Sequence, residues 1–100
     1  MGSLSYTGLF VLQAVAQGYR FGFDIMDATS LPSGTVYPAL RRLEALNFVE
    51  SAWEDDERAK RENRPRRRNY RLTRAGRSQL HEADSRFRAV SKLFPTKGQA

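Results

Sequence analysis

The sequence predicts a mainly helical fold with one small antiparallel β-hairpin. Between residues 5 and 46, apolar residues recur every three or four positions, which is typical of helices that bury one face. After Asn47 the apolar period shortens to two, which indicates strands. A helical period returns after Thr73. With 100 residues and no internal repeat, the chain is expected to form one domain.

The first helix is expected over residues 5–17. Ser5 or Thr7 can cap its start, because each offers a side-chain oxygen to the unpaired amides of the first turn. Gly18 is well placed to end it.

A shorter second helix is expected over residues 22–28, followed by a turn at residues 29–32. Its inward positions are Phe23 or Ile25, together with Met26.

A third helix is expected over about residues 33–46, with Ser33 as its N-cap. Pro38 is tolerated because it stands near the first turn, where a missing donor matters least. The apolar positions form one buried stripe: Val36, Leu40, Leu43 and Leu46. Polar and aromatic side chains lie outside that stripe: Thr35, Tyr37, Arg41 and Arg42.

Residues 48–54 and 68–72 are expected to pair as an antiparallel hairpin, with Tyr70 and Leu72 on one face. The polar segment 55–67 between them is too long for a tight turn and is expected to be a mobile loop.

Thr73 is expected to cap a last helix over residues 75–94. Its apolar positions recur at helical spacing: Leu80, Ala83, Phe87, Val90 and Phe94. The expected organisation is a domain of residues 1–74, with this helix belonging to the same compact unit.

Charge is concentrated in one segment. The chain carries a net charge of +6, and ten of its 17 Lys and Arg lie between Arg58 and Arg77, opposed there by Glu62 alone. Such density favours a polyanionic partner, and nucleic acid is the commonest one. A solvated, disordered basic loop is the alternative, and an anionic membrane surface is a further one. No run of about 18 apolar residues is present, so no membrane span is expected.

A third helix followed by a basic hairpin is the organisation of a winged helix-turn-helix. An α-helix fits the major groove of DNA, and its N-terminal amides suit a phosphate. The wing is expected at about residues 48–72. The candidate DNA-binding residues on the helix and the wing are Ser33, Gly34, Thr35, Tyr37, Pro38, Arg41, Arg42, Arg64, Arg66, Arg67 and Arg68.

Three segments resemble the PadR-type transcriptional regulators. Residues 33–44 (SGTVYPALRRLE) are similar to that family's recognition-helix signature. Residues 64–77 (RPRRRNYRLTRAGR) are similar to its wing, second strand and next helix start. Residues 18–25 (GYRFGFDI) are similar to a Gly-Pro-x-His-Gly-Tyr-x-Ile pattern, although Tyr19, Phe21 and Phe23 replace its Pro, His and Tyr.

The resemblance implies a dimeric, DNA-binding repressor that is often relieved by a small aromatic or amphipathic ligand. It also implies dimerisation through C-terminal helices, of which one is expected before Pro95, as in a short family member. The candidate dimerisation residues are Leu80, Ala83, Phe87 and Val90. Ordinary packing of this helix onto its own domain is the alternative. A palindromic operator on double-stranded DNA is the expected target.

Other chemistry has little support in the sequence. Trp53 can line an effector site or simply pack in the hairpin. The acidic run Asp55-Asp56-Glu57 is expected to be solvated, and the single histidine, His81, has no partner for a metal site. The chain has no cysteine, which fits a cytoplasmic protein. No cofactor is expected. A winged-helix module that contacts protein or RNA and a small enzyme or metal protein remain as alternatives.

Overall fold

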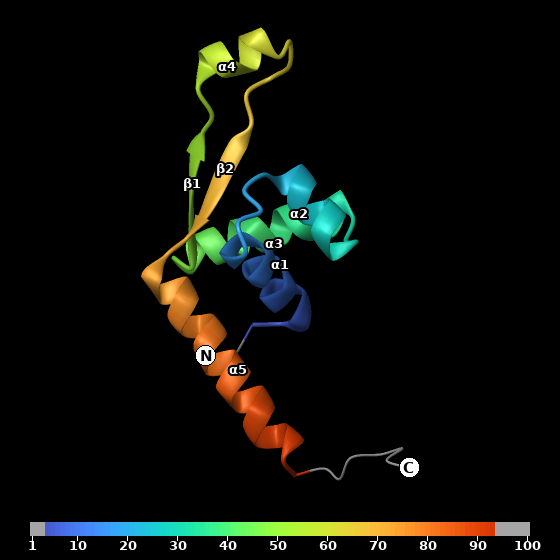
Figure 1. The fold of residues 1–100 in the computed structure, drawn as a ribbon, viewed down its shortest axis with the longest axis vertical. Coiled ribbons are helices and arrows are strands. Elements are labelled where there is room, and N and C mark those ends of the chain that lie inside the picture. The colour runs from blue at the N-terminus through green and yellow to red at the C-terminus, as the bar shows by residue number, and fades with distance from the viewer. Residues whose placement is uncertain (1–3, 94–100) are drawn as a thin grey trace.

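The computed structural model describes residues 4–93 and confirms a mainly helical fold with one antiparallel hairpin (Figure 1). Its elements in chain order are α1 (Tyr6–Ala16), α2 (Gly22–Thr29), α3 (Ser33–Ala45), β1 (Val49–Trp53), α4 (Asp56–Arg61), β2 (Arg68–Leu72) and α5 (Arg74–Ser91).

The core lies where α1, α2 and α3 pack together at the base of the hairpin. Residues spaced three or four apart on each helix supply it, as amphipathic helices do when they bury one face. Its largest fully buried side chains are Val11, Leu12, Ile25, Val36, Leu40, Leu43 and Val49.

Capping residues set three of the helix boundaries. Ser5 Oγ accepts a hydrogen bond from the amide of Gly8 at 3.1 Å, and Thr73 Oγ1 accepts one from Gly76 at 3.0 Å. Gly18 follows α1 with a φ of 102°, a left-handed conformation that glycine adopts without steric cost. These three assignments from sequence are confirmed.

The start of α3 differs from expectation. Pro32, and not Ser33, is the N-cap residue, and no side chain caps the helix. The amides of Thr35 and Val36 both bond to the carbonyl of Pro32, at 2.9 and 3.0 Å. Ser33 is therefore the first helical residue. Proline suits the cap position because its ring fixes φ near the value of −75° that it has here.

Two further positions on α3 also differ. Pro38 stands in the second turn of α3 rather than near the first. Leu46 lies just past the end of α3 and is 43% exposed, so it does not extend the buried stripe. On α2 the structure decides between the two expected alternatives: Ile25 is buried and Phe23 is 73% exposed, and Met26 packs against the core as expected. Helical geometry separates Phe23 from Ile25 by about 200° around the axis, so both cannot face the core.

The hairpin pairs Val49 with Leu72 and Trp53 with Arg68 in antiparallel register. Tyr70 is buried and Leu72 packs against the core, as expected of residues on one face. Because β1 and β2 join α3 to α5 and project beyond the helical core, they form the wing of a winged helix (Figure 1).

The expectation that residues 55–67 form a loop throughout was wrong. This segment contains the short helix α4, whose N-cap Asp55 accepts a hydrogen bond from the amide of Glu57 at 3.2 Å. Asp56 and Glu57 stand in the first turn and basic residues in the last, so the charges complement the helix dipole. The acidic run is exposed, as expected of a solvated cluster, and it also forms the start of a helix.

Helix α5 begins at Arg74, one residue before the expected range 75–94, and ends at Ser91, three residues before its end; Phe94 lies outside the described residues. Its first turn packs closely at Gly76, and Leu80 contacts the core. Beyond Leu80 the helix runs past α1 and projects away from the core (Figure 1). Within residues 4–93, no helix is both long and apolar enough to cross a membrane.

Candidate nucleic-acid interface

The outer face of α3 carries the side chains that the sequence assigned to DNA. Pro38, Arg41 and Arg42 are exposed, and Thr35 is half-buried. At the start of the helix Ser33 and Gly34 are exposed, and no side chain caps the first amides. An uncapped, accessible helix N-terminus is an environment that suits a phosphate.

Tyr37 has a packing role besides its exposure. Its side chain is 38% exposed, and its ring lies against Gly22 at the start of α2. A Cβ placed on Gly22 would approach Tyr37 Cε1 to 2.4 Å. Gly22 is thus the residue that lets the tyrosine lie between α2 and α3, which fixes the direction of its ring.

A buried carboxylate organises the arginines of the wing. Glu54 follows β1, and its side chain is 5% exposed. Its Oε2 accepts hydrogen bonds from Arg64 Nη2 at 2.8 Å and from Arg67 Nη2 at 3.1 Å. The amide of Arg67 donates to Glu54 Oε1 at 3.2 Å, and Arg66 Nε donates to the backbone oxygen of Glu54 at 3.0 Å.

These contacts stabilise the ionised form of Glu54. The hydrogen bond from Arg64, opposed by burial and reinforced by Arg67, lowers the pKa of Glu54 from its ordinary 4.5 to about 2. The same pair raises the pKa of Arg64 further above its usual range. Arg64 and Arg67 therefore hold the wing together, and much of their charge is neutralised within the protein.

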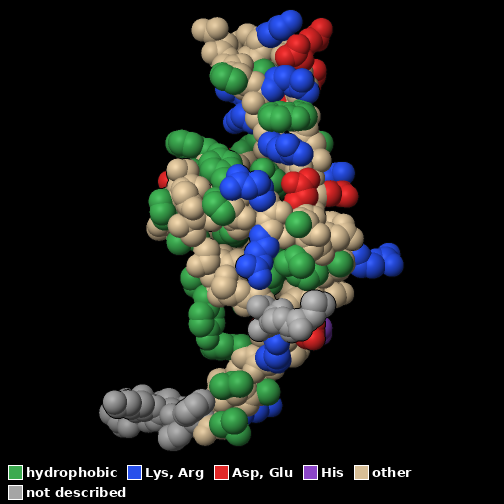
Figure 2. All heavy atoms as spheres, turned by 180° about the vertical axis from the view of Figure 1, so that it is seen from behind, with side chains coloured by type: hydrophobic (Ala, Val, Ile, Leu, Met, Phe, Trp, Pro, Cys, Tyr) green, Lys and Arg blue, Asp and Glu red, His purple; other side chains and the backbone are tan. Residues whose placement is uncertain are grey.

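Arg66 and Arg68 occupy a different position. Their guanidinium groups lie over the ring of Trp53, at 5.7 and 5.2 Å from its centroid. Both are exposed, as is Trp53. Figure 2 shows basic and hydrophobic side chains alternating along this side of the wing. The wing thus presents two cations separated by an indole, rather than four equivalent arginines.

Polar contacts fix the wing relative to α3. Ser51 Oγ donates to Glu44 Oε2 at 2.6 Å, and Arg68 Nε donates to Ser51 Oγ at 2.8 Å. Arg68 Nη2 also lies 3.8 Å from Glu44 Oε2. Because Glu44 belongs to α3, this chain of contacts sets the wing and the helix in one orientation.

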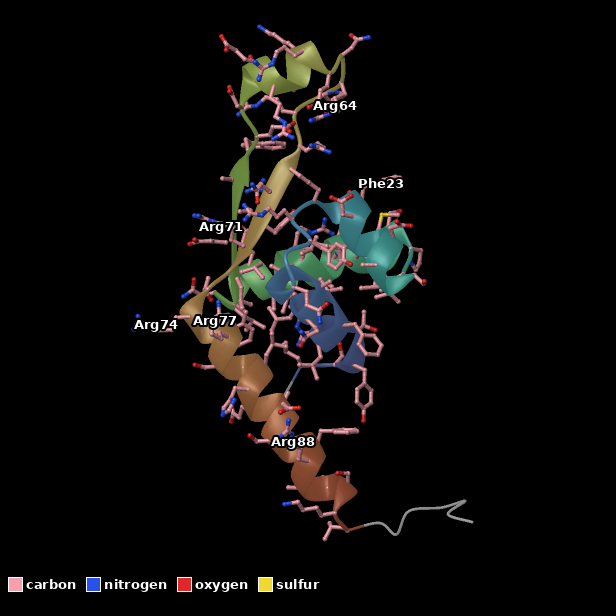
Figure 3. All side chains as sticks on the ribbon, in the orientation of Figure 1. Phe23, Arg64, Arg71, Arg74, Arg77 and Arg88 are labelled. Atoms are coloured by element: carbon pink, nitrogen blue, oxygen red, sulfur yellow. The ribbon has the colours of Figure 1, made fainter. Side chains whose placement is uncertain are left out.

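The base of the wing carries arginines that were not among the DNA-binding residues predicted from the sequence. Arg71 pairs with Glu50 at 3.1 Å, and Arg74 and Arg77 are exposed at the start of α5. Figure 3 places all three along the edge that faces away from α2. The high density of positive charge between residues 58 and 77 could have identified these arginines. No pattern in the sequence indicated that Glu54 is buried and binds the wing arginines.

The four candidate dimerisation residues divide into two pairs. Leu80 and Ala83 are half-buried, whereas Phe87 and Val90 are 71% and 52% exposed. A cavity of about 740 Å³ lies between α5 and the start of α1, with Tyr6 and Phe10 on its other wall. Tyr6 and Phe10 are also largely exposed, at 82% and 58%. The apolar surface therefore spans two helices.

Trp53 is exposed on the wing, and His81 is exposed on α5. Among residues 4–93, no three His, Asp or Glu side chains converge as ligands for one metal ion.

These features define a winged helix-turn-helix with a basic wing and an exposed recognition helix. The sequence model of a protein family, the transcriptional regulator PadR-like family, matches residues 11–82. The chain therefore belongs to the PadR-like family of transcriptional regulators, a family whose regulation acts through DNA binding. A search of curated proteins found no match.

Solved structures share the fold. A PadR family regulator from Clostridium difficile R20291 superposes with a TM-score of 0.78 at 23% identity, covering 89% of this chain and 94% of that one. BldR from Sulfolobus solfataricus gives 0.75 at 20% identity, covering 96% and 66%. BpsR from Bordetella bronchiseptica, whose DNA binding is regulated by 6-hydroxynicotinic acid, gives 0.72 at 20% identity, covering 91% and 64%.

Proposed function

We propose that this protein is a homodimeric repressor that binds a palindromic operator in double-stranded DNA. The observation that carries the proposal is the rigid connection of an exposed recognition helix to a basic wing, through Glu44, Ser51 and Arg68. A helix in the major groove and a wing on the adjacent backbone must keep one relative orientation, and this connection supplies it.

Within each half-site, Thr35, Tyr37 and Arg41 read base edges, because they lie on the outer face of α3. The amides at Ser33 and Gly34 bind a phosphate, and Arg42 contacts the backbone. Pro38 adds an apolar contact. On the wing, Arg66 and Arg68 neutralise phosphates, while Arg64 and Arg67 support them through Glu54.

The dimer forms through the apolar surface between α5 and α1, which a second copy covers. Residues 1–74 act as the DNA-binding domain, and residues 75–94, of which α5 covers the part up to Ser91, act as the dimerisation segment of the same compact unit. Four exposed large apolar side chains support this arrangement: Tyr6, Phe10, Phe87 and Val90. A two-fold dimer places two recognition helices about 10 base pairs apart, or a multiple of that distance.

Repression follows if the bound dimer blocks a promoter, and a small aromatic effector relieves it. BpsR, a protein of the same fold, supports this through its regulation by 6-hydroxynicotinic acid.

The test is recovery of DNA. Purified protein is mixed with sheared DNA from its own genome, and the retained fragments are sequenced. We expect a recurrent palindrome near a promoter, and an Arg41→Ala variant that does not enrich it. Retention of fragments without any shared sequence would contradict an operator-specific role.

A further inference from the structure

The segment before α2 joins the wing to the helical core. Residues 20–21 run along the edge of β2 that β1 leaves unpaired, where the amide of Tyr70 donates to the carbonyl of Arg20 at 2.8 Å (Figure 1). Phe21 and Asn69 pair there as an isolated antiparallel bridge. Phe21 is also the N-cap residue of α2, so this one residue belongs both to the wing sheet and to the helix-turn-helix.

Arg67 holds Phe21 from the side of the wing. The Cζ atom of Arg67 lies 3.8 Å from the centroid of the Phe21 ring, which is half-buried. A cation over an aromatic face at this distance is attracted by the ring, and the attraction is stronger where water is excluded. Arg67 is itself fixed, because its Nη2 and its amide both donate to the carboxylate of Glu54. The ring of Phe21 is therefore anchored to the buried acid of the wing.

On its other side, the same segment positions Tyr37 of α3. Gly22 follows Phe21 directly, and a Cβ at this glycine would overlap the ring and the hydroxyl of Tyr37. Gly22 is the first residue of α2 and has no left-handed φ, and alanine forms helices better than glycine does. The space for the tyrosine ring, and not the backbone conformation, thus requires glycine here. A displacement of Phe21 must consequently move the surface on which Tyr37 lies.

The wing and the recognition helix are therefore joined at two points. Glu44, near the C-terminal end of α3, contacts Ser51 and Arg68. Tyr37, seven residues earlier, contacts the segment that Arg67 holds. This separation corresponds to about 10 Å along a helix. A single attachment would let α3 pivot against the wing, whereas two attachments separated along its axis fix its direction.

We propose that Phe21 is a positioning residue that determines operator specificity through Tyr37. Its stack with Arg67 and its place before Gly22 set the direction of the Tyr37 ring relative to the wing. This role rests on the proposed contact between Tyr37 and the base edges. It also gives a physical reason for one departure from the family pattern, in which a histidine stands at this position. Phe21 stays uncharged beneath a cation, whereas a histidine would gain charge below about pH 6.5.

The first measurement follows Tyr37 in the absence of DNA. The four tyrosines are labelled with fluorine, and the NMR signal of Tyr37 is identified by its loss in Tyr37→Phe. Phe21→Leu should shift or broaden this signal, because leucine offers Arg67 no aromatic face. Phe21→Tyr keeps that face and should leave the Tyr37 signal at its wild-type position. The control is Tyr19→Leu, which removes an exposed ring two residues earlier in the chain and should also leave the signal in place.

The second measurement gives the base preference of each variant. The protein is mixed with a library in which every base pair of the operator is varied in turn, and the bound DNA is sequenced. Phe21→Leu should reduce discrimination about fivefold at the base pair where Tyr37→Phe reduces it, and little at other base pairs or on random DNA. A purely structural role would lower the affinity at every base pair alike. The double variant should lose less than the product of the two single losses, because residues that act together are not additive.

A second variant approaches the same contact from the wing. Arg67→Lys keeps the charge but loses the flat guanidinium, so it should change the Tyr37 signal and the base preference as Phe21→Leu does. The matched control is Arg61→Lys on α4, an exposed position that should leave both readouts unchanged. Thermal unfolding by circular dichroism checks that each variant is folded. If Phe21→Leu does not fold, Arg67→Lys decides the question with the same two readouts.

Three results would overturn the proposal. They are a wild-type Tyr37 signal in folded Phe21→Leu, a wild-type base preference in that variant, and an equal loss of affinity at every base pair. A wild-type protein that prefers no operator over random DNA would instead contradict the proposed function. The Tyr37 signal would then still decide whether Phe21 positions the ring.

Discussion

At the scale of single residues, Glu54 has the largest organising effect on the wing. One carboxylate receives side-chain donors from two arginines and a backbone donor as well. A buried acid with this many donors remains ionised far below its usual pKa. Its contribution to stability must therefore depend on pH.

Acidification should lower the thermal stability of the wild-type protein over the pH range in which Glu54 becomes protonated. The pKa of this carboxyl is about 2 when folded and 4.5 ordinarily, so its stabilisation is complete above about pH 5 and is lost as the pH falls toward 2. Thermal unfolding by circular dichroism from pH 2 to 7 measures this slope. Glu54→Gln should be less stable at neutral pH and should show a shallower acid slope.

Part of the slope should remain in that variant, because contacts from Arg58 and Arg64 also lower the pKa of Glu62. The control is Glu57→Gln, since Glu57 forms no side-chain ion pair among residues 4–93. Equal acid slopes in Glu54→Gln and wild type would contradict the role given to Glu54.

Two glycines should respond to alanine with opposite signs. A Cβ at Gly76 would lie 2.1 Å from the backbone oxygen of Phe48, so Gly76→Ala must shift α5 and should cost about 1–3 kcal/mol. A Cβ at Gly34 would meet nothing within 4 Å, so Gly34→Ala should stabilise α3 by about 0.5–1 kcal/mol. Urea denaturation measures both. A stabilised Gly76→Ala variant would show that α5 does not approach Phe48 so closely.

At the scale of elements, we propose that the wing contacts the DNA backbone and that α3 contacts the bases. Arg64 and Arg67 face Glu54 and hold the wing, while Arg66 and Arg68 stack on Trp53 at its surface. Phosphate contacts position a protein on DNA and base contacts select the sequence. The two elements should therefore be separable by experiment.

Salt dependence should distinguish the two kinds of wing arginine. Arg66→Gln and Arg68→Gln should each reduce the slope of log K against log salt by about 0.9, because each removes one phosphate contact. Arg64→Gln should lower the melting temperature and change the slope less. Fluorescence anisotropy with labelled DNA at several salt concentrations gives these slopes. Equal slopes for all variants and wild type would show that the wing does not contact the DNA phosphate backbone.

Specificity should depend on the outer face of α3. Arg41→Ala should cost about 1–3 kcal/mol on the operator and little on random DNA. For Tyr37 the informative change is Tyr37→Phe, because the ring packs on Gly22 and its complete removal would disturb α2. Competition titrations with operator and random DNA measure both. Equal losses of binding free energy on operator and random DNA would show that these residues only position the protein and do not select the sequence.

At the scale of the whole molecule, a large apolar surface extends over two helices. The outer half of α5 projects beyond the core (Figure 1). A cavity of about 740 Å³ lies between it and the start of α1. Exposed apolar patches of this kind mark interaction surfaces in soluble proteins. We propose a second copy of the chain as the partner of this surface.

Phe87→Asp should therefore produce monomers. Phe87 is 71% exposed, so the change leaves the core intact but places an unpaired charge in the proposed dimer interface. Sedimentation velocity at micromolar concentration measures the assembly. Ser85→Asp, on an exposed position of α5 that does not line the cavity, should remain dimeric. A monomeric wild type, or a folded and dimeric Phe87→Asp variant, would contradict the proposed interface.

The sequence by itself determined the order of every element except α4, and most of their boundaries to within a few residues. Helical and strand periods are local properties, and so are the caps at Ser5 and Thr73, because a cap bonds within its own first turn. The recognition helix and the basic wing were predictable for the same reason. The family resemblance, which depends on contiguous residues, was confirmed by the match over residues 11–82.

Only the tertiary structure decided which arginines are engaged and where cavities lie. Glu54 and Arg64 are ten residues apart, and nothing in their spacing shows that they meet. The contact between Phe21 and Arg67 likewise depends on how the wing stands relative to α2. Helix α4 was missed because the charged residues that stabilise it are equally typical of a solvated loop. Contacts between segments distant in sequence arise from packing geometry, and local patterns do not encode that geometry.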